Sequence, residues 1–225
     1  MNATQSQLAV IWDMDGVIVD SEPLHCSAWR TTFKKHGVKL TEEEYQQFSG
    51  RRDDDTIRHF MGKGVSETVI ASVSNEKQAT FRQLVAAEHV IALPGAILLI
   101  HALSHKHVKQ ALASSAPIAN IKLILDMLEL TSYFPVIISA TDVTRGKPDP
   151  QAFLIAAKRL EIEPMYSIVI EDAVAGVAAG KAAGMKVIAV TTTNPRDKLA
   201  HANVVVDSLE EISFAAILKL SRRQA

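Results

Sequence analysis

The chain has 225 residues, of which 48% are hydrophobic and 22% are charged, which is the composition of a globular protein and argues against a disordered one. Its 24 Lys and Arg residues against 25 Asp and Glu residues leave a net charge of −1, without the basic excess expected of a nucleic-acid binder. The single cysteine, Cys26, excludes an internal disulfide framework. The length allows one large domain, or a main domain with a smaller insert.

The first seven residues lack the basic segment, apolar stretch and small-residue cleavage site of a signal peptide. No run approaches the roughly 18 to 20 apolar residues that span a bilayer. We therefore expect a cytoplasmic protein that binds neither membrane nor nucleic acid, and we expect a monomer.

Six short apolar or β-branched runs end in polar or small residues, as buried parallel strands do. Between them, residues 118–130 and 151–160 carry apolar side chains at helical spacing. Alternating strands and helices predict a Rossmann-like, doubly wound α/β fold with a parallel sheet. The predicted strands are 8–12, 108–113, 136–138, 166–170, 186–190 and 203–206.

The alternation fails between residues 21 and 93, where helical patterns and turns occur without strands. Residues 41–44 read Thr-Glu-Glu-Glu, which is typical of a capping box at the start of a helix. Pro94 and Gly95 mark the return to the sheet. We predict an α/β core domain formed by residues 1–20 and 94–225, and a helical insert of residues 21–93.

Asp13 and Asp15 follow the first predicted strand, at the edge where open α/β sheets bind ligands. One carboxylate can attack phosphorus, and a second can act as general acid and then as base. Taken alone, the Asp-x-Asp-Gly pattern is equally typical of a turn.

Ser114 and Ser115 end the second predicted strand. A hydroxyl and adjacent backbone N–H groups at this position can hold a phosphate. Alternatively, Ser115 caps the helix that begins near Pro117.

Lys147 stands in the loop Thr144 to Pro150, which Gly146 and Pro148 constrain. A fixed lysine is suited to neutralising a carboxylate and a transferring phosphoryl group. The alternative is a solvated turn lysine.

Glu171 and Asp172 follow the strand predicted to end at Ile170, and they are placed to bind a hard cation together with Asp13. Gly176 and Gly180 then share one face of a helix, at a cost of about 1 kcal/mol each relative to alanine. We predict that these glycines allow the helix to pack closely on the sheet.

Taken together and in this order, the four motifs make the chain resemble the haloacid dehalogenase superfamily of phosphotransferases over nearly its whole length. Residues 13–23, Ser114, Lys147 with residues 146–150, and Glu171-Asp172 match the four motifs of that superfamily. The helical insert is similar to the type 1 cap of the branch that contains β-phosphoglucomutase and sugar-phosphate phosphatases.

The resemblance implies a Mg²⁺-dependent phosphatase. In this mechanism Asp13 forms an aspartyl-phosphate, and Asp15 protonates the leaving alcohol and then activates water. Mg²⁺ is held by Asp13, the backbone carbonyl of Asp15, Glu171 and Asp172. Ser114 and Lys147 bind the phosphoryl oxygens, and Mg²⁺ and Lys147 together bring three positive charges to an anionic reaction. The substrate implied is a small phosphorylated metabolite, with sugar phosphates ahead of polyol and glycolate phosphates.

Other members of the superfamily fit less well. Asp15 argues against a dehalogenase, which lacks an acid at that position, and residues 49–53 lack the lysine of phosphonoacetaldehyde hydrolases. A phosphomutase stays open, because His25 and Trp29 match that enzyme. However, Ser49 and Asp53 stand where the mutase has a lysine and an arginine.

The substrate-binding residues that we expect in the insert are His25, Gly50, Arg51 and Arg52, although a packing histidine and a solvated loop are the alternatives. Two readings from another class stay open. One is a phospho-accepting switch, against which the Asp13–Asp15 pair and the long insert argue, and the other is an inactive phosphosugar binder.

Overall fold

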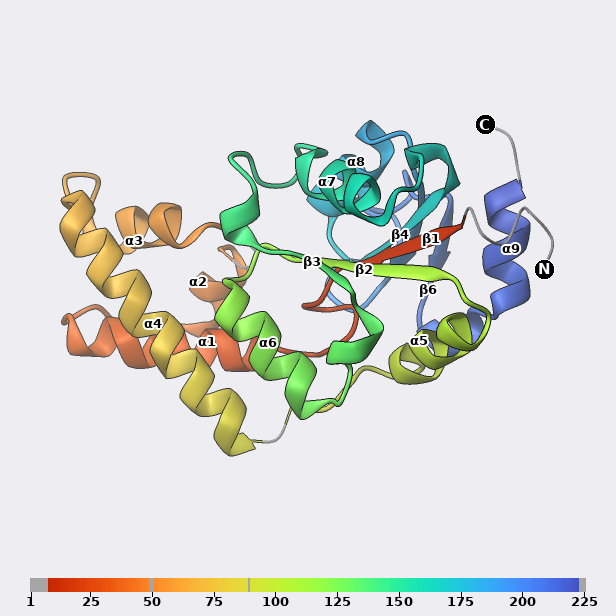
Figure 1. Cartoon of the computed structure of the whole chain (residues 1–225). Coiled ribbons are helices and arrows are strands. Elements are labelled where there is room, and N and C mark those ends of the chain that lie inside the picture. The colour runs from red at the N-terminus through yellow and green to blue at the C-terminus, as the bar shows by residue number, and fades with distance from the viewer. Residues whose placement is uncertain (1–7, 49–50, 89, 223–225) are drawn as a thin grey trace. The chain divides into compact units, whose positions relative to one another are not determined.

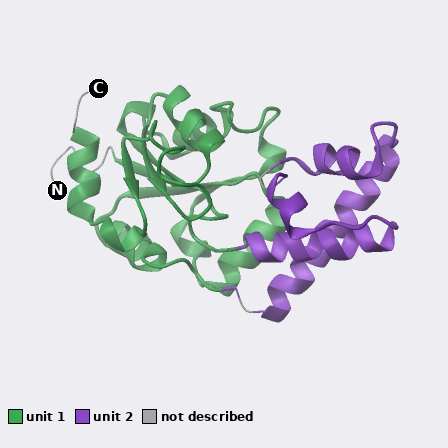
Figure 2. Ribbon diagram, turned by 180° about the vertical axis from the view of Figure 1, so that it is seen from behind, with its two compact units in different colours: residues 1–20, 91–225 green, residues 21–90 purple. Residues whose placement is uncertain are grey.

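The computed structural model describes residues 8–48, 51–88 and 90–222. The chain divides into two compact units, Met1–Asp20 with Ile91–Ala225 and Ser21–Val90 (Figure 2). We call these the sheet unit and the helical unit. The helical unit ends at residue 90, where the sequence suggested 93, and the assignment of the two units as separate domains stays a prediction.

The sheet unit is built on one parallel sheet in the order β3-β2-β1-β4-β5-β6 (Figure 1). Strands β2 and β3 lie on one side of β1, and β4, β5 and β6 lie on the other. The predicted doubly wound α/β fold is therefore confirmed. The strands are β1 (Ala9–Trp12), β2 (Lys109–Ala113), β3 (Val136–Ile138), β4 (Ser167–Glu171), β5 (Lys186–Val190) and β6 (Val204–Val206).

The predicted strands match these bounds within one residue at each end. One small difference matters for the site, because Glu171 is the last residue of β4 rather than the first residue beyond it. Glu171 is in register with Ala189 of β5, so its backbone still belongs to the ladder. Glutamate is depleted in β-strands, so the sequence pattern ended the predicted strand one residue before Glu171.

Helices cover both faces of the sheet. α7 and α8 pack on one face, where alternate strand residues such as Ile11, Val169 and Val187 join their side chains in one apolar cluster. α5 lies on the opposite side (Figure 1) and contacts β2, and α9 contacts α5 and β4. The helices of this unit are α5 (Ala96–His105), α6 (Ile118–Met127), α7 (Gln151–Leu160), α8 (Val174–Ala182) and α9 (Phe214–Arg222), with short 3-10 turns η1 (Thr131–Tyr133), η2 (Ala140–Asp142), η3 (Pro164–Tyr166) and η4 (Leu209–Glu211).

A buried polar link ties α5 to the sheet. The indole N–H of Trp12 donates to Gln110 Oε1 at 3.0 Å, and Gln110 Nε2 donates to the carbonyl of Ile100 at 3.1 Å. Because these buried polar groups are all hydrogen-bonded, the strands β1 and β2 carry them without an unpaired donor. The side chain of Gln110 thereby connects β1, β2 and α5.

The helical unit consists of α1 (Glu22–Lys35), α2 (Glu42–Gln46), α3 (Asp53–Met61) and α4 (Glu67–Glu88). α4 packs along both α1 and α3, around a core of Trp29, Phe33, Ile57 and Val73. The predicted capping box is confirmed, because Glu44 N donates to Thr41 Oγ1 at 3.2 Å and Thr41 N donates to Glu44 Oε2 at 2.8 Å. Within the described residues of both units, every helix is too short or too polar to cross a membrane.

Candidate active site

Three neighbouring strands bring the sequence motifs together. β1 lies between β2 and β4, and all three run parallel, so their carboxyl ends share one edge of the sheet. Asp13 follows β1, Ser114 follows β2, and Glu171 and Asp172 end and follow β4. This edge is also where the strand order reverses, which is the usual ligand site of such sheets.

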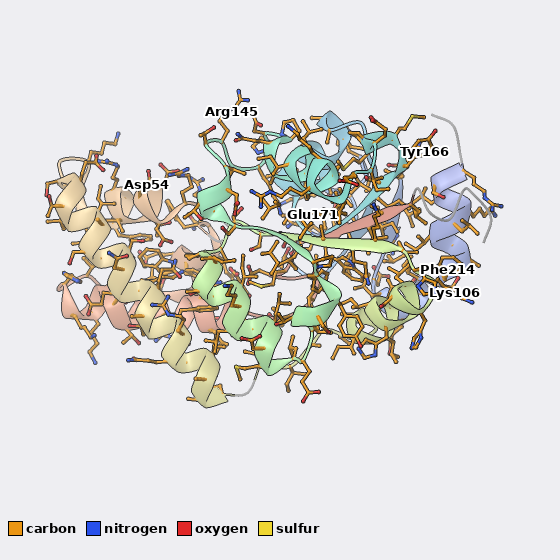
Figure 3. The ribbon with its side chains drawn as sticks, in the orientation of Figure 1. Asp54, Lys106, Arg145, Tyr166, Glu171 and Phe214 are labelled. Atoms are coloured by element: carbon orange, nitrogen blue, oxygen red, sulfur yellow. The ribbon has the colours of Figure 1, made fainter. Side chains whose placement is uncertain are left out.

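Three of these residues form a buried acidic cluster. Asp13, Glu171 and Asp172 each offer a carboxylate oxygen, and these atoms lie within 4.8 Å of one another. The residues are 7%, 1% and 4% exposed, respectively. Glu171 is labelled in Figure 3, at the end of its strand. Closely spaced carboxylate oxygens are the donors that hard divalent cations such as Mg²⁺ and Ca²⁺ take, so this set fits such an ion.

Lys147 completes the cluster from the loop that precedes α7. Its ammonium forms ion pairs with Asp13 Oδ1 and, at 2.6 Å, with Glu171 Oε1. Its side chain is 11% exposed, and Nζ lies 5.1 Å from the centre of the Phe153 ring. The alternative of a solvated turn lysine is therefore wrong. Three carboxylates beside one ammonium leave an excess of negative charge that a divalent cation would cancel.

Burial dominates the electrostatics of these groups. It raises the pKa of Asp13 to about 7, with further contributions from Glu171 and Asp15 and an opposing one from Lys147. Burial, together with Glu171 and Asp13, also raises the pKa of Asp172. Burial opposes the charge of Lys147, but the carboxylates of Asp13 and Glu171 outweigh it and hold the pKa of the ammonium above its ordinary value. The cluster therefore favours the binding of a cation, which adds positive charge.

Asp15 and Ser114 lie beside each other at the edge of the cluster. Ser114 is buried, and its Oγ is 3.5 Å from Asp15 Oδ2. The same Oγ accepts the backbone N–H of Ala116 at 3.0 Å. Ser115 is exposed, and the N-cap residue of α6 is Pro117, so the alternative of Ser115 as a helix cap is wrong. Helix α6 starts at Ile118, as the sequence suggested, directly after Pro117 in an extended conformation.

Two glycines make room for the acidic side chains. Gly16 has φ +78°, and a Cβ there would overlap the carboxylate of Asp172. A Cβ on Gly176 would likewise overlap the carboxylate of Glu171, whose Oε2 accepts the backbone N–H groups of Asp172 and Ala173. The predicted packing of a glycine against the sheet is confirmed for Gly180, where a Cβ would meet Val187. Gly176 instead accommodates an acidic side chain of the site.

Sequence reasoning missed the polar loop that follows β5. Thr192 Oγ1 donates to the carbonyl of Gly16, and Thr193 Oγ1 donates to Asp172 Oδ2. Asn194 Nδ2 donates to the carbonyl of Asp172 at 3.2 Å. One signal was available, since a run of polar residues follows a predicted strand directly at the same edge of the sheet.

The remaining expected site residues belong to the helical unit. Arg52 is exposed, and its Nε is 3.0 Å from Asp54 Oδ1. The guanidinium of Arg51 lies over the ring of Phe48, 4.7 Å from its centre. Both arginines are therefore engaged by local neighbours. Gly50 lies outside the described residues.

His25 takes part in a partly buried polar cluster of the helical unit that the sequence did not reveal. Lys77 of α4 is 3% exposed, and its ammonium lies 3.1 Å from His25 Nδ1, which accepts because an ammonium can only donate. Asp53 Oδ1 is 3.9 Å from the same Nζ. His25 also stacks on Phe81, with ring centres 3.9 Å apart. A lysine in the middle of a long helix gives no sequence signal of such a position.

A family model described as haloacid dehalogenase-like hydrolase matches residues 10–190. Two curated relatives are similar along almost their whole length. Validoxylamine A 7'-phosphate phosphatase of Streptomyces hygroscopicus subsp. limoneus is 33% identical, over 92% of this chain and 96% of its own. Hexitol phosphatase A of Escherichia coli (strain K12) is 35% identical, over 90% of this chain and 92% of its own.

Solved structures agree with the fold. A HAD hydrolase of family IA, variant 3, from Entamoeba histolytica HM-1:IMSS has a TM-score of 0.89 at 25% identity, covering 96% of this chain and 100% of its own. β-Phosphoglucomutase from Clostridium difficile has a TM-score of 0.83 at 29% identity, covering 95% and 96%. The relatives therefore include both phosphatases and a phosphomutase.

Proposed function

We propose that this chain, which belongs to the family of haloacid dehalogenase-like hydrolases and is a phosphatase, hydrolyses a small phosphorylated metabolite with the help of Mg²⁺. We propose a sugar phosphate as the substrate, and polyol and glycolate phosphates are the next candidates. Relatives named as phosphatases of validoxylamine phosphate and of hexitols support that choice.

The buried contact of Asp13 with Lys147, beside Glu171 and Asp172, is the observation that carries the proposal. A carboxylate can approach an anionic phosphate only where positive charge offsets the repulsion. Lys147 supplies part of that charge, and a cation bound by the acidic cluster would supply the rest. Mg²⁺ would be held by Asp13, Glu171 and Asp172 with the backbone carbonyl of Asp15, and when bound it supplies Lewis-acid neutralisation of the phosphoryl oxygens.

The proposed reaction has two steps. A carboxylate oxygen of Asp13 forms a bond to phosphorus while the bond to the ester oxygen breaks, and Asp15 gives its proton to the leaving alcohol. In the second step Asp15 takes a proton from water, the water oxygen bonds to phosphorus, and the bond to Asp13 breaks to release phosphate. Ser114, with Ser115 next to it in the chain, and Lys147 bind the phosphoryl oxygens throughout.

We propose that the helical unit serves as the cap of the enzyme and selects the substrate, through His25, Arg51, Arg52 and the adjacent Gly50. A cap that excludes bulk would restrict the enzyme to small phosphorylated metabolites. This assignment rests on the resemblance of the insert to type 1 caps.

A phosphomutase is the second candidate, since the relatives include β-phosphoglucomutase. A mutase must hold a second phosphate, and Asp53 argues against it. The Asp53 carboxylate accepts from Ser74 Oγ at 2.6 Å and Gln78 Nε2 at 2.8 Å, and these two bonds hold the side chain in place. A fixed negative charge at this position opposes the binding of a second phosphate.

Measurement of phosphate release from a panel of sugar, polyol and glycolate phosphates with Mg²⁺ tests the proposal. We expect turnover of at least one sugar or polyol phosphate. Conversion of a hexose 1-phosphate to its 6-phosphate without phosphate release would instead favour the mutase. Stable labelling of Asp13 by acetyl phosphate, with no turnover of any substrate, would favour a phospho-accepting switch, and binding without either reaction would favour an inactive phosphosugar binder.

A further inference from the structure

The loop of residues 191–194, directly after β5, is bonded to both acidic loops of the site. Thr192 Oγ1 donates to the carbonyl of Gly16, next to Asp15 in the chain. Thr193 Oγ1 donates to Asp172 Oδ2 at 2.5 Å, and Asn194 Nδ2 donates to the carbonyl of Asp172 at 3.2 Å. Three consecutive side chains therefore connect β5 to the residues that follow β1 and β4.

The bond from Thr193 is directed by its neighbour. Asn194 Nδ2 donates to Thr193 Oγ1 at 3.1 Å. A hydroxyl has one hydrogen and two lone pairs, so an oxygen that accepts from Asn194 keeps its own hydrogen for Asp172. Of the two Asp172 oxygens within reach of that hydrogen, the carboxylate Oδ2 at 2.5 Å is much nearer than the backbone carbonyl at 3.3 Å, so the hydroxyl serves the carboxylate.

Asp172 is confined from the opposite direction as well. Its carboxylate lies where a Cβ of residue 16 would be, so the absence of a side chain at Gly16 leaves space that Oδ2 occupies. Thr193 itself is exposed, whereas Asp172 is 4% exposed. Among the residues that the structure describes, the Thr193 hydroxyl donates a hydrogen bond to this buried carboxylate, which lies beside the acidic side chains of Asp13 and Glu171.

We propose that Thr193 is a positioning residue of the divalent-cation site, which holds the carboxylate of Asp172 in the orientation in which it meets Asp13 and Glu171. The inference rests on the proposed Mg²⁺-dependent function. It predicts that the Thr193 hydroxyl preorganises the site, so that less orientational freedom is lost when the ion binds. Outer-shell hydrogen bonds of this kind typically change metal affinity by about 10- to 100-fold.

The experiment measures Mg²⁺ binding to the full chain by isothermal titration calorimetry, without substrate, for three variants. Thr193→Val removes the hydroxyl at nearly constant shape, and Thr193→Ser keeps it. Thr191→Val is the matched control in the same loop, because Thr191 Oγ1 donates to the exposed Asp207 at 2.7 Å, away from the acidic cluster.

We expect Thr193→Val to weaken Mg²⁺ binding by about 10-fold or more, and Thr193→Ser and Thr191→Val to stay within about 2-fold of the unmodified chain. The Mg²⁺ concentration for half-maximal phosphate release should rise in parallel in Thr193→Val, while KM at saturating Mg²⁺ is unchanged. Circular dichroism without metal identifies any variant that fails to fold, and if Thr193→Val does so, Thr193→Ala, which also removes the hydroxyl, takes its place in the comparison with Thr193→Ser and Thr191→Val.

Unchanged Mg²⁺ affinity in Thr193→Val would overturn the assignment, and so would an equal loss in Thr191→Val, which would mean that loop stability alone matters. In both cases the unmodified chain still binds Mg²⁺ and releases phosphate, so the proposed function stands. If the unmodified chain neither binds Mg²⁺ nor releases phosphate, the proposed function fails and the positioning role fails with it.

Discussion

The two units each bury a lysine, and they surround it differently. Lys147 in the sheet unit contacts two carboxylates of a cluster that contains three, and its side chain is 11% exposed. Lys77 in the helical unit lies 3.9 Å from the carboxylate of Asp53, and its ammonium also lies near His25 Nδ1 and the rings of Trp29 and Phe81. One ammonium lies among an excess of carboxylates, and the other lies beside a more distant carboxylate, an imidazole and two aromatic faces.

The difference shows what each environment can do. An ammonium among buried carboxylates leaves the whole cluster negative and ready for a further cation, as a metal-dependent phosphate site requires. An ammonium among aromatic rings gains cation–π and hydrogen-bond energy but leaves no such excess. We therefore expect changes around Lys147 to affect catalysis, and changes around Lys77 to affect stability.

The largest expected effect is that of Asp13→Asn in the sheet unit. An amide still accepts a hydrogen bond from Lys147 but is a far weaker nucleophile than a carboxylate, so the fold should persist without the reaction. We expect phosphate release to fall by about a thousandfold or more. Steady-state phosphate assays and circular dichroism measure the two effects, and retained turnover would refute the assignment of Asp13 as the nucleophile.

Much of the sheet unit could be predicted because the periodicity of buried strands also locates their ends. Once β1, β2 and β4 were recognised, Asp13, Ser114 and Glu171 followed, since parallel neighbours end at the same edge. Lys147 depended on the resemblance, because nothing local distinguishes a buried loop lysine from a solvated one. Thr193 was missed because its role depends on the spatial neighbourhood of the loops after β4 and β5, which a strand pattern alone does not specify.

The second-largest effect is expected for Gly176 of α8, with Gly180 of the same helix as its control. Gly176→Ala should displace the carboxylate of Glu171, because the new Cβ would overlap it. We expect kcat to fall by about tenfold or more, together with a loss of about 1–3 kcal/mol in the free energy of unfolding from overpacking. Phosphate assays over a range of Mg²⁺ concentrations and urea unfolding measure these quantities.

Gly180→Ala is the control within the same helix. Its Cβ would meet Val187 Cγ2 at 2.8 Å and Val169 at 3.4 Å, both apolar side chains of the sheet. We expect a similar loss of stability, partly offset by the helix propensity of alanine, and kcat within about twofold of the unmodified chain. A comparable fall of kcat in both variants would mean that the position of α8, rather than the space at Glu171, controls activity.

The helical unit was harder to predict because its polar cluster joins three helices that are distant in sequence. Lys77 is separated in sequence from His25 by 52 positions and from Asp53 by 24. Helical periodicity does not determine which helices face each other. The expected arginines were chosen for their charge, but Arg51 and Arg52 are engaged by Phe48 and Asp54 nearby. Charge in a loop indicates exposure more reliably than it indicates a site.

Lys77→Met tests the stabilising role expected in this unit. Methionine fills a similar volume but leaves His25 Nδ1 without this donor and Asp53 without the nearby cation. Asp53 keeps its bonds from Ser74 and Gln78, so we expect a moderate loss of about 1–3 kcal/mol in the free energy of unfolding. Arg52→Ala, which removes an exposed cation, should change it by less than about 0.5 kcal/mol. Equal values in urea unfolding would mean that the burial of Lys77 contributes nothing.

The smallest effect concerns the capping box of α2. The sequence predicted this feature of the helical unit in full, because its two partners are only three residues apart. Hydrogen bonds from Thr41 hold the pKa of Glu44 below its ordinary value of 4.5. The folded state therefore favours the ionised form, and this stabilisation is complete above pH 4.5 and is lost as the pH falls through the folded pKa. Glu44→Gln should thus be less stable than the unmodified chain near neutral pH, and the difference should shrink as the pH falls below 4.5, as urea unfolding over that pH range can measure. Glu43→Gln removes a charge from the same first turn without touching the capping box, so an identical pH dependence in that variant would assign the effect to the helix terminus in general and not to Glu44.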